Sequence, residues 1–101
     1  MKLKPGVRLE GLSPQMALAA LIVQSCYDSA SCTITSANDG QHSEKSLHYS
    51  GNALDFRTKD YFGDKRMLVN AVRKALGPEF DVVFEDEGTP NEHLHVEYDP
   101  K

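Results

Sequence analysis

The sequence has no long hydrophobic run. Its longest apolar stretch is MALAALIV, at residues 16–23, whereas a membrane-spanning helix needs about 18 or more apolar residues. The basic N-terminus, MKLKPG, is not followed by the apolar segment of a secretory signal. We therefore expect a protein made in the cytoplasm, with neither a signal peptide nor a membrane span. If it acts outside the cytoplasm, another factor must release it.

Cysteine is scarce, with only Cys26 and Cys32 in the chain. The two thiols do not form a Cys-x-x-Cys pattern, and they are too few for a disulfide scaffold. A bridge between them would close only a short loop from the end of a helix to a strand. We expect both to be reduced thiols in or beside the core, and we do not expect them to bind zinc.

Lysine and arginine are absent from a 21-residue stretch near the C-terminus. Residues 79–99 contain eight carboxylates and no Lys or Arg. Nucleic-acid binding needs clustered positive charge, so this pattern argues against a nucleic-acid partner. The acidic stretch is better suited to binding a cation. The alternative is that it forms a solvated acidic face that keeps the protein soluble.

The overall composition describes one small domain. The chain has 101 residues, a net charge of −4 and 40% hydrophobic residues. Folding at this length removes about 60 to 70% of the unfolded chain's surface from water, which allows one thin core but not two. No repeat, low-complexity tract or linker divides the chain. We expect a single domain over residues 1–101, acting as a monomer, to whose stability a bound ion can add.

Two segments have the periodicity of amphipathic helices. The first begins after Ser13, a preferred N-cap residue, with Pro14 at the first helical position, and its apolar stripe continues to about Tyr27. The second covers residues 64–76 and is followed by a Gly-Pro pair that stops a helix. The sequence therefore predicts two helices, each burying one face.

The remaining regular segments are β-branched or alternating and predict four strands, at 32–36, 52–57, 80–85 and 93–98. The last two are separated by a loop typical of a hairpin. In the final strand, alternation places His93, His95 and Glu97 on one face and the apolar residues on the other. The order α, β, β, α, β, β predicts an α+β fold: a small, mostly antiparallel sheet with two main helices packed on one side.

Three residues from distant segments could bind one metal ion. His48 lies in a polar loop, Asp55 in the second predicted strand and His95 in the last. Two imidazoles, a carboxylate and a water are a ligand set of catalytic zinc sites, and Asp55 and His95 can face one cleft if their strands are neighbours. Taken singly, each residue could equally be an ordinary turn or surface residue.

Two motifs carry a family resemblance. The run SLHYSGNALD, at residues 46–55, resembles the Ser-x-His-x-x-Gly-x-Ala-x-Asp signature of the zinc D-Ala-D-Ala peptidase family. The run EHLH, at residues 92–95, is similar to that family's second motif, in which an acidic residue three positions before the last zinc histidine is the general base. The two motifs themselves are short, and their order and setting match over nearly the whole chain.

The resemblance implies a fold shared with the hedgehog signalling domain and, for peptidase members, cleavage of bacterial cell-wall peptides. Small members of this kind are often phage-encoded lytic enzymes. Carried over by position, His48, Asp55 and His95 would hold one zinc ion, Glu92 would be the general base, and His93 would stabilise the oxyanion or hold the substrate.

Glu92 presents a geometric difficulty, because a regular strand would put it on the face opposite His95. It must therefore come from the end of the loop, before the strand becomes regular. The alternative is that Glu97 or Glu87 is the base instead.

The substrate-binding residues are less defined. Many family members have a Ser-Gly-Tyr-Arg stretch whose arginine is expected to bind substrate, whereas this chain reads SAND at residues 36–39. Arg57 or Lys45 could bind the substrate's negative groups instead. Ser46 either bonds near the metal or caps the turn before His48, and His42 either contacts substrate or is an exposed loop residue.

Two functions follow as hypotheses. The first is a zinc metallopeptidase, a carboxypeptidase or endopeptidase, that hydrolyses peptidoglycan stem peptides or cross-links as a phage or phage-derived enzyme acting at the cell wall after release. The second is a non-catalytic zinc domain that binds a partner. The acidic residue in the base position favours the first, and the missing arginine favours the second.

Overall fold

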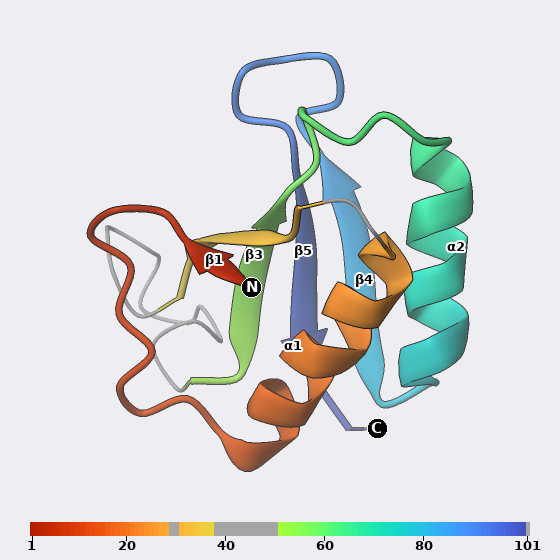
Figure 1. The fold of residues 1–101 in the computed structure, drawn as a ribbon. Helices are drawn as coiled ribbons and strands as arrows, with labels where there is room; N and C mark the ends of the chain where they lie inside the picture. The colour runs from red at the N-terminus through yellow and green to blue at the C-terminus, as the bar shows by residue number, and fades with distance from the viewer. Residues whose placement is uncertain (29–30, 38–50, 101) are drawn as a thin grey trace.

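A five-stranded mixed sheet with two helices on one face makes up the fold (Figure 1). The computed structural model describes residues 1–28, 31–37 and 51–100. The strands lie in the order β1-β2-β3-β5-β4. Along the chain the elements are β1 (Lys2–Leu3), α1 (Pro14–Tyr27), β2 (Thr33–Ser36), β3 (Ala53–Arg57), α2 (Lys65–Leu76), β4 (Phe80–Glu85) and β5 (His93–Tyr98). The α+β fold predicted from the sequence is confirmed.

Both helices begin at capped N-termini. The Ser13 hydroxyl accepts a hydrogen bond from the Met16 amide at 3.2 Å, with Pro14 at the first helical position. The Asp64 carboxylate caps α2 in the same way, by accepting from the amides of Arg66 and Met67. Within the described ranges, no helix is long and apolar enough to cross a membrane.

Three of the four strand pairings are antiparallel, and β1 is the exception. It pairs in parallel with β2, placing Lys2 opposite Thr33, and was not predicted. Two residues are too few to show an alternating pattern, so this strand exists only because β2 offers it an edge. The pairing places the N-terminal segment at the edge of the sheet beside β2, and Lys4, which follows β1, lines a cavity described below.

Alternation along the central strands separates the core from the polar face. The side chains of Leu54, Phe56, Leu94 and Val96 are 0% exposed and pack toward the helices. Helix α1 contacts β3 and β5, and α2 contacts β4, so both helices cover this one face (Figure 1). Residues at the intervening positions are therefore directed away from the helices.

Both cysteines are free thiols, as predicted. Cys32 is 4% exposed within the core, and burial raises its pKa to about 12. Cys26 is half-buried, and burial raises its pKa as well. These neutral thiols contribute to packing.

Gly51 lies where the chain enters β3, pressed against the segment that precedes α1. Its φ is +77°, and its carbonyl accepts a hydrogen bond from the Ser13 amide at 3.0 Å. A Cβ atom at this position would lie 2.0 Å from the Gly11 carbonyl oxygen. The glycine between His48 and Asp55 is thus required by close backbone contact as well as by its dihedral angle.

We expect Gly51→Ala to lower the free energy of unfolding by at least about 3 kcal/mol, because the new methyl group collides with backbone that cannot move aside. Gly88→Ala is the matched control, since Gly88 has a φ of +82° but open space around it. It should cost only about 1 kcal/mol. Urea denaturation of both variants measures the difference, and equal losses would contradict the steric argument.

Candidate metal site

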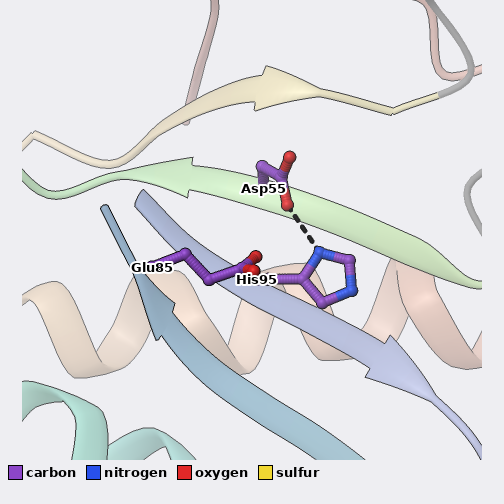
Figure 2. A group of neighbouring side chains, drawn as sticks. All are labelled: Asp55, Glu85 and His95. Atoms are coloured by element: carbon purple, nitrogen blue, oxygen red, sulfur yellow. Dashed lines mark hydrogen bonds and ion pairs between the residues drawn. The ribbon is translucent and has the colours of Figure 1, made fainter. Parts of the chain in front are cut away.

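Asp55 and His95 face each other across the two central strands. They are register partners in the antiparallel pairing of β3 with β5, so their side chains project from the same face. His95 Nδ1 donates to Asp55 Oδ1 at 2.7 Å (Figure 2). The structure thus brings together two of the three residues that the sequence predicts as metal ligands.

Glu85, the last residue of β4, extends to the same point. Its carboxylate, Asp55 and His95 each offer one ligand atom, and these three atoms all lie within 4.8 Å of one another. Figure 2 shows the three side chains converging from three neighbouring strands. Two carboxylates and an imidazole are donors that zinc accepts, so the chemistry and spacing of this group fit a metal ion.

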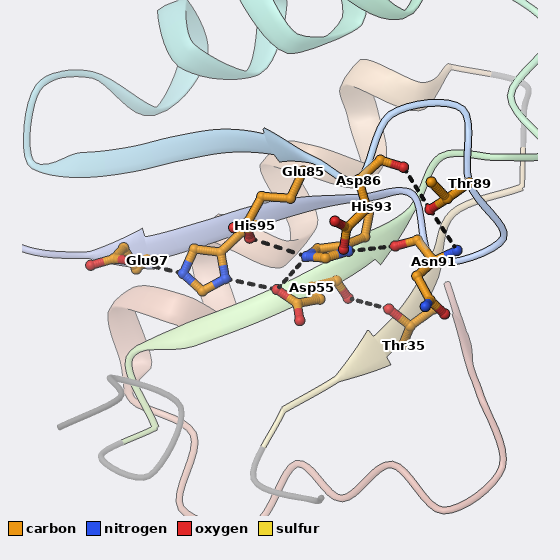
Figure 3. Close-up of polar contacts among 9 residues, drawn as sticks. All are labelled: Thr35, Asp55, Glu85, Asp86, Thr89, Asn91, His93, His95 and Glu97. Carbon is orange, nitrogen blue, oxygen red and sulfur yellow. Dashed lines mark hydrogen bonds and ion pairs between the residues drawn. The ribbon is translucent and has the colours of Figure 1, made fainter. Parts of the chain in front are cut away.

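His93 lies beside this group at the first position of β5. Its Nε2 donates to Glu85 Oε1 at 3.1 Å and lies 3.9 Å from Asp55 Oδ1. Its Nδ1 donates to the Asn91 carbonyl at 2.7 Å. Both ring nitrogens therefore have acceptors, which orient the imidazole (Figure 3).

The surrounding carboxylates favour protonated imidazoles when no metal is bound. The hydrogen bond to Asp55, aided by Glu97 at 2.8 Å from Nε2 and opposed by burial, raises the pKa of His95 to about 9. Burial also opposes the charge of His93, but the Asn91 carbonyl and the nearby Asp55 and Glu85 raise its pKa. Metal binding at His95 must displace a proton from the imidazole.

Glu92 has a different environment from the one that its proposed catalytic role suggests. It precedes β5, as expected, and is 5% exposed. One carboxylate oxygen accepts from Thr58 Oγ1 and Lys65 Nζ, both at 2.7 Å, and the other accepts from the Gly88 amide at 2.9 Å. Burial opposes the charge, yet these three donors lower the pKa of Glu92. The contacts tie the β4–β5 loop to the start of α2.

The remaining predicted residues are divided between the described and undescribed parts of the chain. Arg57, at the end of β3, is the register partner of His93 and lies 3.7 Å from Asp60. His48, Ser46 and His42 lie outside the described residues, so their predicted roles stay predictions.

The sequence reasoning missed Glu85, which it counted only as part of an acidic run. A signal was present, because Asp81, Val83 and Glu85 alternate along a strand that forms a hairpin with the His-x-His strand. In that register Glu85 lies opposite His93 and Val83 opposite His95. Applying the alternation of β5 to its hairpin partner would have placed Glu85 on the polar face.

In metal-free protein we expect the free energy of unfolding to fall as pH rises through the range set by His95. The pKa of His95 is raised from 6.5 to about 9, so the folded state keeps a proton that the unfolded chain releases. The stabilisation is complete below pH 6.5 and is lost as pH approaches 9, with roughly 2 kcal/mol involved. Denaturation at a series of pH values across this range should show that the free energy of unfolding of His95→Gln depends less on pH than that of wild type. Parallel curves would contradict the assignment.

We expect Glu92→Gln to destabilise the fold by about 1–3 kcal/mol, because Lys65 and Thr58 lose a charged acceptor in a buried site. Because the pKa of Glu92 is lowered, its contribution to the free energy of unfolding is present above pH 4.5. This contribution is lost as the pH falls through the pKa of Glu92 in the folded state. Glu87→Gln, at an exposed position of the same loop, should change stability by less than about 0.5 kcal/mol. Thermal melts at neutral and acid pH compare the two, and equal effects would exclude the anchoring role.

Comparison with known families comes to the same fold. The search of curated proteins returns no match for this chain. Residues 12–97, which include both helices, β2 to β4 and β5 up to Glu97, match the family profile of the Hedgehog amino-terminal signalling domain. The fold of that family is related to that of the zinc D-Ala-D-Ala peptidases. The chain therefore belongs to the Hedgehog amino-terminal signalling domain family.

Proposed function

We propose that this protein is a zinc-dependent peptidase that hydrolyses peptide bonds of bacterial peptidoglycan. The observation that carries the proposal is the convergence of Asp55, His95 and Glu85 from three adjacent strands on one polar face. The resemblance of residues 46–55 and 92–95 to zinc peptidase motifs supports it, as does a fold related to those enzymes.

In this proposal Asp55, His95 and His48 hold one zinc ion. A zinc ion bound there would supply Lewis-acid activation of a water molecule and of the scissile carbonyl. The chain's own part is to fix the ligand geometry, and the direct pairing of Asp55 with His95 on neighbouring strands supports this role. Glu97, within 2.8 Å of the second nitrogen of His95, orients the imidazole ring.

We assign the general base to Glu85 in place of Glu92. The Glu85 side chain is 45% exposed, and its carboxylate lies within reach of the ligand atoms of Asp55 and His95. A base so placed can take a proton from the attacking water and pass it to the leaving amine. The Glu92 carboxylate, in contrast, is occupied by three donors and is nearly inaccessible.

His93 supports the same chemistry. It orients Glu85 through the 3.1 Å hydrogen bond. In the metal-free protein burial opposes its charge, but the Asn91 carbonyl and the carboxylates of Asp55 and Glu85 raise its pKa. A cationic imidazole beside the reacting carbonyl would stabilise the developing oxyanion. This agrees with the role predicted for His93 from the family motif.

The setting of the activity is also part of the proposal. We place the site of action at the bacterial cell wall, reached after release from the cytoplasm, in a phage or phage-derived lysis enzyme. The support is the resemblance of residues 46–55 and 92–95 to the motifs of the zinc peptidase family.

A second function, a zinc domain that binds a partner without catalysis, is favoured by two observations. The family that the chain matches is a signalling domain, and Glu92, the base predicted from the motif, is engaged in holding a loop. The two functions share the metal but differ in whether an accessible carboxylate beside it is required.

We expect purified protein to contain about one zinc per chain, by elemental analysis, and to clear bacterial cell walls in zymograms. Chelation should abolish clearing, Asp55→Asn should lose both zinc and activity, and Glu85→Gln should keep zinc but lose activity by about 10²–10⁴-fold. Glu92→Gln, assayed where circular dichroism shows it folded, should retain activity.

Each contrary outcome is informative. Absence of zinc from wild type would remove the proposed function. Zinc without any clearing would favour the partner-binding domain. Clearing that survives Glu85→Gln but is lost in folded Glu92→Gln would return the base to Glu92.

A further inference from the structure

A cavity of about 340 Å³ adjoins the candidate metal site, and three cationic side chains line it: Lys4, Arg57 and Lys59. His93 lines the same cavity and contacts Glu85 of the metal-site group. Thr35 and Asn91 add polar groups to its wall (Figure 3). Asp86 and Glu92 belong to the same lining.

Backbone contacts fix the segments that carry these cations. The Lys4 amide donates to the Ile34 carbonyl at 2.9 Å, which holds the N-terminal segment against β2. The Tyr27 hydroxyl donates to the Arg57 carbonyl at 2.6 Å. Lys59 lies in a turn closed by a hydrogen bond from the Tyr61 amide to the Thr58 carbonyl. The three cations therefore come from two separate segments that tertiary structure brings together.

Among the described residues that line the cavity, the negative charges do not balance the three cations. Glu92 is neutralised by Lys65 at 2.7 Å, and Asp86 is the other carboxylate of this described lining. Asp60, 62% exposed, lies 3.7 Å from Arg57, beyond hydrogen-bond range. An incoming anion can therefore compete for the guanidinium, whose planar donors match a carboxylate.

We propose that this cavity is a binding subsite for a carboxylate of the peptide substrate, next to the bond that is cleaved. The choice of a carboxylate rests on the proposed peptidase function, because His93 connects the cavity to the group that would bind zinc. The subsite replaces, with residues from other positions, the substrate-binding arginine that is missing at residues 36–39. It requires Lys4, from a segment that precedes the region matched by the family profile.

The test is an NMR titration of metal-free protein at low ionic strength with N-acetyl-D-alanine and, as a neutral analogue of the same shape, N-acetyl-D-alaninamide. Only the acid should shift the amide signals of Arg57, Thr35 and His93. Arg57→Gln should raise its Kd about fivefold, and the Lys4→Gln/Lys59→Gln double variant by about threefold to tenfold. Lys74→Gln, an exposed position in the last turn of α2, should change it less than about twofold.

Equal shifts with acid and amide, no binding of the acid, or unchanged affinity in the cavity variants would overturn the subsite. A further contrary result is that the acid binds only after zinc is added, with the same affinity in wild type and in the cavity variants. That result would place the carboxylate on the metal and would also overturn the proposed subsite.

A kinetic comparison separates this proposal from the peptidase function. With a cell-wall peptide ending in a free carboxylate, Arg57→Gln should raise KM and leave kcat nearly unchanged, and with the amidated peptide it should change neither. If no peptide is hydrolysed while the acid still binds metal-free protein selectively, the peptidase function fails and the anion subsite stands.

Discussion

The hydrogen bond between His95 and Asp55 joins β5 to β3, and the candidate metal site on the polar face depends on this contact. Its geometry follows from the register of β3 with β5, in which the two residues are direct partners. The same register directs Leu54 and Phe56 into the core. A shift by one residue would bury the carboxylate and expose the apolar side chains, so core formation and assembly of the candidate metal site are enforced by the same pairing.

Burial and hydrogen bonding distinguish carboxylates that look alike in the acidic C-terminal sequence. Glu92 and Glu85 lie at opposite ends of the loop between β4 and β5. Glu92 accepts hydrogen bonds from three donors: Lys65 at the start of α2, Thr58 directly after β3, and Gly88 in the loop itself. Glu85 remains accessible beside His93 and the Asp55–His95 pair. Glu92 holds the loop, whereas the position of Glu85 follows from its pairing with His93 in the β4–β5 register.

Two oppositely charged regions adjoin on this face. The carboxylates around His95 suit a cation, and the cavity lined by Lys4, Arg57 and Lys59 suits an anion, with His93 between them. A metallopeptidase acting on a peptide with a free carboxylate would use both. The Hedgehog-type fold, related to zinc peptidases, is compatible with either catalysis or partner binding, and the chemistry must be inferred from these side chains.

The sequence by itself determined the elements that have strong local signals. Ser13 and Pro14 marked the start of α1, and the alternation in residues 93–98 separated His93 and His95 from the apolar core side chains. Asp55 and His95 were predicted to face one cleft because motif and alternation agreed, and the register of β3 with β5 places them together. Only tertiary structure decided the rest: β1 is too short for a pattern and depends on the edge of β2, the burial of Glu92 depends on donors from distant segments, and the contact of Glu85 with His93 depends on the pairing of β4 with β5. Local periodicity indicates which face of an element a residue occupies. Partners from distant parts of the sequence determine the charges around that residue and its exposure to solvent.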